Sequence, residues 1–428
     1  MSPGATSKRE VVDVAVVGGG PAGLAVAASL GKAGVDRVVV LDREPEMGGI
    51  PRHANHQGFG VRDLRRLMSG PRYAARITEL AAASGAELRT ETQVTGWADN
   101  NALELTSPRG RSQLAARAVV LATGCRERPR SARLVPGSRP QGVITTGTLQ
   151  QLVYLRNESP GQRAVIIGAE HVSFSALITL AHAGAHAVAM VTDLPRHESF
   201  APIRAAVALR FHTPLLTRTA LSAIHGHQRV EAVELTRVDT GEVLNISCDL
   251  VVFTADWIPE HELAVLGGAA LNPATRGPAV DPSLRTSRPG LFAAGNHLHG
   301  AEPADVAALS GRHAAATVIR HLDGEPWPTA RLPIECHPPL RWIAPNVLPR
   351  SSVADLAPAR GRFLLRAHEA LSTPLVELAQ DSRPLWRGRL RRLGPGRSAS
   401  LPSTWTNAVD TDGGPILARV IQGRRRTL

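Results

Sequence analysis

The sequence predicts an α/β fold made of two strand–helix–strand units and a small β-rich C-terminal domain. An apolar strand, a glycine-rich turn, a helical run and a second strand follow one another from Val11 to Asp42. The same order returns from Ala164 to Asp193. After a proline-rich stretch that begins near Gly324, short strand-like runs alternate with turns. Helices that alternate with apolar strands are typical of parallel sheets.

Size and charge narrow the class of protein. The chain has 428 residues, of which 43% are hydrophobic, enough for two or three domains. The formal net charge is +12, from 49 Lys+Arg and 37 Asp+Glu. The positive charge is nearly all arginine and is spread along the chain, which argues against nucleic-acid binding. The densest basic stretches, Arg387–Arg397 and Arg424–Arg426, leave a weak contact with an anionic partner or with lipid headgroups open.

The cysteines point to a reducing compartment and away from thiol chemistry. Cys125, Cys248 and Cys336 are far apart in sequence, which excludes a CxxC redox pair and cysteine-ligated zinc or iron–sulfur sites. No spacing of His, Asp or Glu indicates a metal. The N-terminus lacks the apolar core of a signal peptide, and no run of about 18 apolar residues could span a membrane. We therefore expect a cytoplasmic protein.

The first unit carries a phosphate-binding turn. VVDVAVV (11–17) suits a strand of a buried parallel sheet, and LAVAASLGKAG suits the helix that follows. Gly18, Gly20 and Gly23 between them match GxGxxG, whose glycines allow a tight turn, a close approach of pyrophosphate and close helix packing. Asp42 ends the second strand, where its carboxylate can accept bonds from ribose hydroxyls. This unit predicts dinucleotide binding but does not distinguish FAD from NAD.

Three further segments carry a resemblance to a known family. Met47-Gly48-Gly49 follows the acidic residue, Ala122-Thr123-Gly124 closes a strand after a β-hairpin, and Thr286–Asn296 runs from a strand into a turn. Together with the first turn they resemble the pyridine nucleotide–disulfide reductase superfamily over about residues 11–325. The chain also resembles the FAD subunits of amino-acid and opine dehydrogenases, including hydrogen cyanide synthase and heteromeric sarcosine oxidase.

The resemblance implies two Rossmann-like domains that bind FAD and NAD(P), with the second inserted in the first. The FAD-binding domain would comprise residues 8–155 and 280–325, the NAD(P)-binding-like domain 156–279, and the β-rich domain 330–428. It also implies a set of residues around FAD: Gly18, Gly20, Pro21, Ala22, Gly23, Asp42, Arg43, Gly49, Arg52, Val94, Ala122, Thr123, Gly124, Gly295, Asn296 and Ala304. Asn296 stands where the superfamily usually has Asp.

Two departures from the superfamily bear on the chemistry. The Gly48–Gly60 segment has no cysteine and the second unit has no CxxC, so we expect no dithiol reaction. In the second unit Gly168-Ala-Glu170-His-Val-Ser173 replaces GxGxxG, which places Glu170 where a pyrophosphate would approach. This argues against tight NAD(P)H binding, although Asp193 and Arg196 leave it open.

By the same resemblance, the Gly49–Gly60 segment runs over the flavin ring. His53 is our first candidate for the base that accepts a proton as hydride leaves the substrate, and His56 is another. Arg52 could clamp a substrate carboxylate. His299 and Glu302 form a second cluster just before a helix that would begin near Pro303. The alternative is that these side chains only close loops and cap helices.

These observations predict an FAD-dependent oxidoreductase that takes hydride from a small amine, amino acid or hydroxy compound. Electrons would pass to oxygen, a quinone or a partner subunit, and we expect an oligomer. One alternative is an NAD(P)H-dependent flavin reductase of the same fold. The other is a non-catalytic FAD-binding subunit of a heteromeric dehydrogenase, with the C-terminal domain as its docking module.

Overall fold

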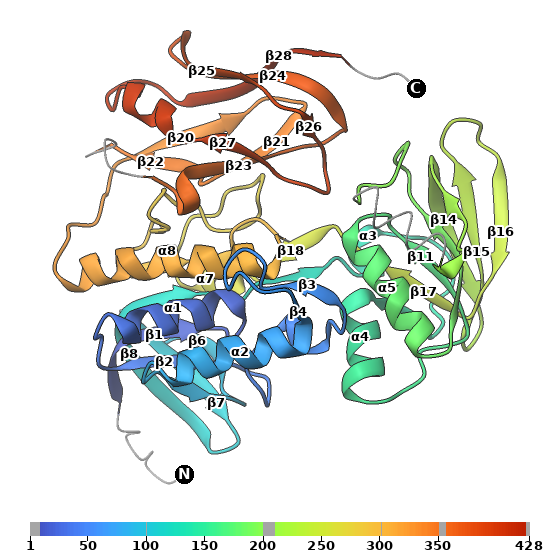
Figure 1. Cartoon of the computed structure of the whole chain (residues 1–428), viewed down its shortest axis with the longest axis horizontal. Coiled ribbons are helices and arrows are strands. Elements are labelled where there is room, and N and C mark those ends of the chain that lie inside the picture. Colours follow the sequence, from blue (N-terminus) through green and yellow to red (C-terminus); the bar gives the residue numbers. More distant parts are fainter. Residues whose placement is uncertain (1–8, 100, 200–209, 301, 351–356, 425–428) are drawn as a thin grey trace, which may run out of the picture. The chain divides into compact units, whose positions relative to one another are not determined.

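The computed structural model describes residues 9–99, 101–199, 210–300, 302–350 and 357–424 (Figure 1). The chain forms two compact units. The first comprises Met1–Arg52, Gly58–Cys125 and Pro259–Thr427, and the second comprises His53–Gln57 and Arg126–Ile258. The predicted α/β class with a β-rich C-terminal region is confirmed, whereas the three predicted domain boundaries stay a prediction.

A seven-stranded sheet forms the centre of the first unit. Its strands in spatial order are β5 (Glu87–Arg89), β2 (Val38–Leu41), β1 (Glu10–Val17), β8 (Gly110–Leu121), β7 (Ala102–Ser107) and β6 (Gln93–Trp97), and β19 (Leu291–Ala293) pairs with β8. β1 runs parallel to β2 and β8, while β7 returns antiparallel to β8 as the predicted hairpin. Because β1 and β2 are covered on both faces, their apolar runs are nearly continuous.

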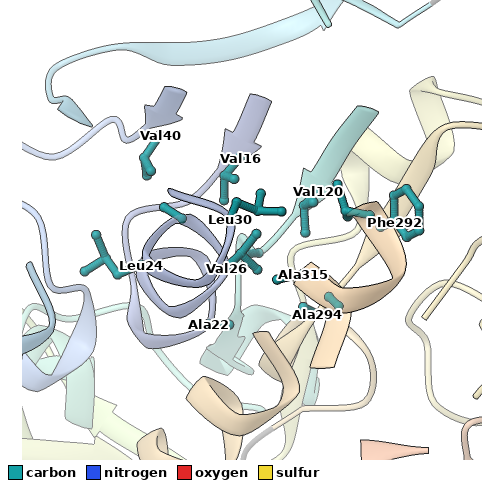
Figure 2. Packing of buried hydrophobic residues seen from close by; sticks show 14 of the residues in the cluster. Val16, Ala22, Leu24, Val26, Leu30, Val40, Val120, Phe292, Ala294 and Ala315 are labelled. Carbon is teal, nitrogen blue, oxygen red and sulfur yellow. The ribbon is translucent and has the colours of Figure 1, made fainter. Parts of the chain in front are cut away.

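Helices α1 (Pro21–Lys32), α2 (Gly70–Ala82) and α8 (Ala304–Leu322) belong to the same unit. α1 begins with Pro21, which is favoured at the first position of a helix. A Cβ on Gly311 of α8 would lie 2.1 Å from the carbonyl oxygen of Ala22, so small residues allow α1 and α8 to pack closely. Figure 2 shows Val16, Val26 and Ala315 meeting in the core between these helices and the sheet.

The second unit repeats the strand–helix–strand design. Its parallel sheet has the order β10 (Val143–Thr145), β17 (Leu250–Phe253), β11 (Arg163–Ile167), β12 (His186–Val191) and β13 (Leu215–Leu216). Helices α4 (Thr146–Leu155) and α5 (His171–His182) follow β10 and β11. A separate antiparallel sheet contains β14 (Thr219–Gly226), β15 (Val230–Arg237) and β16 (Val243–Ser247).

The C-terminal region is all-β, as the sequence predicts. One sheet has the order β22 (Val347–Pro349), β20 (Arg331–Cys336), β28 (Ile416–Arg424), β24 (Leu371–Gln380) and β25 (Arg383–Arg389), with β26 (Arg392–Leu393) beside β24. The other contains β21 (Leu340–Ala344), β23 (Arg362–Ala367) and β27 (Ala399–Pro402). Phe363, Leu378 and Trp405 are buried in the core of these two sheets.

Short elements complete the part of the chain that the structure describes. The remaining helices and strands are α3 (Arg130–Arg133), α7 (Glu262–Leu266), β3 (Gln57–Phe59), β4 (Met68–Ser69), β9 (Cys125–Glu127) and β18 (Trp257–Pro259), and the 3-10 turns are η1 (Ile50–His53), η2 (Gly295–His297), η3 (Ala359–Gly361) and η4 (Thr404–Ala408). Within the described part of the chain, no helix combines the length and the apolar character needed to cross a membrane.

Candidate functional site

The first glycine turn leaves open space at one position. A Cβ on Gly18, whose φ is 109°, would lie 2.4 Å from the carbonyl oxygen of Ala122. A Cβ on Gly23 would lie 1.9 Å from the carbonyl oxygen of Gly18, so packing of the protein alone requires both glycines. A Cβ on Gly20 would meet nothing closer than the Cα of Gly49, at 4.0 Å. Gly20 therefore borders a gap that the chain does not fill.

The acidic residue and the next glycine pair surround this gap. Asp42 accepts hydrogen bonds from the backbone N–H groups of Gly19 (2.6 Å) and Glu44 (2.8 Å). The N–H of Gly48 donates to the carbonyl oxygen of Gly19 at 2.7 Å. Each carboxylate oxygen of Asp42 keeps a further lone pair, so the group can still accept bonds from a ligand. Pro21 and Ala22 start α1, whose N-terminus has no side-chain cap.

Arg52 is engaged within its own loop. Its guanidinium donates to the carbonyl oxygen of Glu46 at 2.9 Å and lies 3.4 Å from the carboxylate of the same residue. The carboxylate of Glu44 lies 4.0 Å from the same guanidinium. Arg43, by contrast, is exposed and lies 3.9 Å from Glu44. The guanidinium of Arg52 thus binds an acidic loop, which competes with the predicted role as a substrate clamp.

The predicted histidines of this segment fall on the other side of the unit boundary. His53 ends η1 and is buried, while Nδ1 of His56 lies 2.8 Å from the carbonyl oxygen of Gln57. Both belong to the second compact unit, whereas Arg52 belongs to the first. The structure does not gather these three residues into one unit, so their catalytic roles stay predictions.

The end of β8 forms a buried polar junction. The hydroxyl of Thr123 donates to the carbonyl oxygen of Glu260 at 2.9 Å and lies 2.8 Å from Nδ1 of His297. The N–H of Glu260 donates to the carbonyl oxygen of Gly124. Burial lowers the pKa of His297 to about 4, so its ring is neutral at pH 7. The predicted site did not include His297, because the family motif of this loop ends at its neighbour Asn296.

Asn296 is held by the start of the next helix. Its side-chain amide donates to the carbonyl oxygen of Glu302 at 3.1 Å and accepts from the N–H of the same residue at 2.9 Å. α8 begins directly afterwards at Ala304, with Pro303 as its uncapped N-terminal residue. Gly295 has φ 70°, and a Cβ there would lie 2.6 Å from that of Ala22. This loop therefore lies against the first turn of α1, as the motif requires.

A cluster from the C-terminal region fixes Glu302 and His299. The Glu302 carboxylate accepts bonds from Arg366 (3.1 Å) and from the hydroxyl of Ser398 (2.5 Å). His299 stacks on Trp342 with 4.7 Å between ring centroids. Burial, and then the nearby charge of Arg366, lower the pKa of His299 to about 3. No local sequence signal could have revealed these partners, because they are far from residue 302 along the chain.

Val94 lies apart from these groups. It sits on β6, pairs with Leu105, and is buried in the apolar core on one side of the sheet. Its side chain packs in this core, so only its backbone could be offered to a ligand.

The second unit fills its own glycine turn. Glu170 caps α5 in a capping box, in which its side chain accepts from the N–H of Ser173 and the Ser173 hydroxyl accepts from the N–H of Glu170. The glutamate folds back over the turn, since its carboxylate lies 2.8 Å from where a Cβ on Gly168 would stand. The Ser173 hydroxyl lies 2.7 Å from that of Thr254. Burial raises the pKa of Glu170.

A second buried carboxyl caps the neighbouring helix. Glu127 accepts a bond from the N–H of Gly147, in the first turn of α4, at 2.7 Å. Burial raises the pKa of this carboxyl to about 7, and the nearby Glu170 adds to the rise. Arg133 contributes opposite charge to both glutamates and donates to the carbonyl oxygens of Thr254 and Ala255. The altered glycine pattern pointed to Glu170, whereas no motif pointed to Glu127.

The first unit thus fits a dinucleotide, whereas the glycine turn of the second unit is lined by carboxyls of the protein. In the first unit, the gap at Gly20, the uncapped N-terminus of α1 and the acceptors of Asp42 match the needs of a pyrophosphate and a ribose. In the second unit, carboxyls of the protein already occupy the N–H groups of α5 and α4.

The chain is similar in sequence to several known oxidoreductases. An opine oxidase subunit of Agrobacterium tumefaciens (strain Ach5) is 30% identical over 355 residues, which cover 74% of this chain and 67% of that protein. The thioredoxin reductase of Treponema pallidum (strain Nichols) is 27% identical over 293 residues, which cover 66% and 88%. The chain therefore spans about two thirds of the length of the opine oxidase relatives.

Solved structures share the fold. The crystal structure of T. acidophilum thioredoxin reductase superposes with a TM-score of 0.62 at 21% identity and covers 73% of this chain and 99% of that one. L-proline dehydrogenase from P. horikoshii gives 0.53 at 16% identity, over 75% and 57%. The family described as pyridine nucleotide-disulphide oxidoreductase matches residues 12–311. The chain therefore belongs to the pyridine nucleotide-disulphide oxidoreductase family and is an FAD-dependent oxidoreductase.

Proposed function

We propose that this chain is an FAD-dependent dehydrogenase or oxidase whose electron donor is a small amine, amino acid or hydroxy compound, and not NAD(P)H. One observation carries the proposal: Glu170 fills the turn where the pyrophosphate of a pyridine nucleotide would lie. FAD, when bound, supplies an acceptor for the hydride of the substrate. Gly20, Gly49, Asp42 and Asn296 are the residues that we propose to hold it.

The cysteines support chemistry without a redox disulfide. None of the three forms a disulfide, and burial raises the pKa of Cys248 to about 11 and that of Cys336 to about 12. A thiol that stays protonated at neutral pH is a poor nucleophile. Cys125 starts β9 and has no second cysteine beside it in sequence. We therefore propose direct transfer from substrate to flavin.

His299 is the candidate base whose surroundings are best defined. Its Nδ1 lies 3.2 Å from the carbonyl oxygen of Gly300, which assigns the proton to Nδ1 and the lone pair to Nε2. Burial and the charge of Arg366 lower the pKa of His299 to about 3, however, which makes this ring a weak base. His53, our first candidate, and His56 stay candidates for the base.

A stopped-flow experiment tests the choice of donor. We expect NADH or NADPH, mixed anaerobically with the FAD-loaded protein, to leave the flavin absorbance unchanged, whereas a suitable amine, amino acid or hydroxy acid bleaches it. Bleaching by either nucleotide within seconds would show that the chain is a pyridine-nucleotide-dependent reductase.

The variant Glu170→Gly/Ser173→Gly restores the glycine pattern of the second turn. We expect it to bind NADH at least tenfold more tightly than the wild-type protein, about 1.4 kcal/mol, in a fluorescence titration. Glu158→Gly, at an exposed glutamate of the same unit, serves as the matched control and should change nothing. Equal affinity of the wild-type protein, the variant and the control for NADH would show that Glu170 is not what weakens NADH binding.

The name of one relative favours a second candidate function. The Agrobacterium tumefaciens protein is named as one subunit of an opine oxidase. This chain would then be an FAD-binding subunit that is inactive alone, with the C-terminal region as its docking module. Tagged chain purified from its native cells should in that case bring down a second protein, and turnover should require it. The expected cytoplasmic location and oligomeric state stay predictions.

A further inference from the structure

A hollow lies between the start of α8 and the C-terminal strands, all within the first unit. It offers about 60 Å³ and is bordered by Gly295 and Asn296, which belong to the proposed flavin loop. Its walls are mostly apolar, and Leu298, Val306 and Leu364 are among them. An apolar hollow that reaches a cofactor loop is the usual form of a small-molecule site.

Two arginines line the same hollow. Arg360 and Arg362 are exposed, and neither side chain has a hydrogen bond or an ion pair with any residue in the described ranges. No described residue therefore competes with an anion for the two guanidinium groups.

The other charges of the hollow cancel. Glu302 is neutralised by Arg366, and its carboxylate also accepts from Ser398. His299 is neutral, because burial and Arg366 keep its pKa far below 7. The hollow thus presents an apolar wall and a net positive charge at the two arginines. A guanidinium group matches a carboxylate, with which it can form two parallel hydrogen bonds.

We propose that this hollow binds a small carboxylate with an apolar body, held by Arg360 and Arg362. The hollow, at about 60 Å³, has room for more than one water-sized group, so it accepts the body of a small amino or hydroxy acid. The ligand's role as electron donor rests on the proposed function, whereas its binding to the hollow does not.

Calorimetric titration of the FAD-loaded protein tests the site. The probes are L-valine and 2-hydroxy-3-methylbutanoate, each compared with its primary amide, which has the same shape but no negative charge. We expect the acids to bind at least tenfold more tightly than the amides. Arg360→Gln/Arg362→Gln should abolish this preference, while Arg392→Gln, an exposed arginine on β26, should retain it. Equal binding of acids and amides would overturn the proposal.

Flavin reduction separates this inference from the proposed function. If the acids bind through the arginines but no donor reduces the flavin, the site stands and the proposed function fails. If an acid reduces the flavin with a KM that Arg360→Gln/Arg362→Gln leaves unchanged, the function stands and the site is wrong. A rise of at least tenfold in KM in that variant, with a small change in kcat, would support both. Circular dichroism of the variant controls for folding.

Discussion

Gly20 differs from the other motif glycines in the first turn, because the packing of the protein does not require it. Gly18 and Gly23 each face backbone oxygens that would overlap with a Cβ. Gly20 faces a gap. A glycine beside an empty space is needed only if a ligand approaches the backbone at that position. This contrast separates the two reasons for which the same motif requires glycine.

Single alanine substitutions should separate these reasons. Gly20→Ala should leave the thermal stability of the FAD-free protein unchanged but weaken FAD binding at least tenfold, about 1.4 kcal/mol. Gly23→Ala should lower the stability of the FAD-free protein by about 1–3 kcal/mol, because its Cβ would press on the carbonyl oxygen of Gly18. Thermal unfolding with and without FAD measures both. Unchanged FAD affinity in Gly20→Ala would place the cofactor elsewhere.

At the scale of the element, the helices that follow the parallel strands differ in what meets their N-terminal N–H groups. α1 has no side-chain cap, whereas α5 is capped by Glu170 and α4 by Thr145 and Glu127. An uncapped helix N-terminus can offer its N–H groups to a phosphate, whereas a cap takes up one or two of them. Similar strand–helix–strand units therefore differ in the groups that meet the start of the helix.

Glu127 should make stability depend on pH. Its folded-state pKa of about 7 lies above the usual 4.5, so the folded protein holds the proton more tightly than the unfolded chain. The resulting stabilisation is full below pH 4.5 and disappears as the pH rises to 7, a change of about 3 kcal/mol. Glu127→Gln should remove this part of the pH dependence. Urea unfolding at several pH values measures it, and an identical slope in the variant would contradict the assignment.

At the scale of the whole molecule, distant parts of the chain complete the first unit. Arg331 donates to the carbonyl oxygen of Arg285, and Asn346 accepts from the N–H of Val280. Arg366 and Ser398 hold Glu302, whose backbone in turn holds Asn296. The C-terminal region therefore supports the loop that we propose to contact the flavin, and the hollow exists only because both parts are present.

A double-mutant cycle tests this support. Arg366→Leu leaves the carboxylate of Glu302 buried without its cation, which should cost about 3–5 kcal/mol of stability. Adding Glu302→Gln should recover part of that loss, since no buried charge then remains unpaired. Urea unfolding gives the coupling energy, and FAD affinity shows whether the loop around Asn296 has moved. Additive effects of the two changes would mean that the ion pair does not link the regions.

Periodicity and local motifs predicted much of the fold. The strands β1 and β12, the helices α1 and α5, the β7–β8 hairpin and the β-rich C-terminus all follow from short stretches of sequence. The predicted helix near Pro303 is also present: α8 begins at Ala304, with Pro303 as its N-cap, although what caps a helix could not be predicted. A cap depends on side-chain contacts, which a pattern of apolar residues does not record.

By itself, the sequence determined the class of fold, the dinucleotide-type glycine turn of the first unit and the altered turn at Glu170, because each depends on residues a few positions apart. Only the tertiary structure decided that Arg52 is bound to its own acidic loop, that Glu127 lies buried beside Glu170, and that Arg360 and Arg362 border the loop of Asn296. Most of these relations join residues that are distant along the chain. Burial and charge pairing act through space, so their effects appear only when the folded chain brings the groups together.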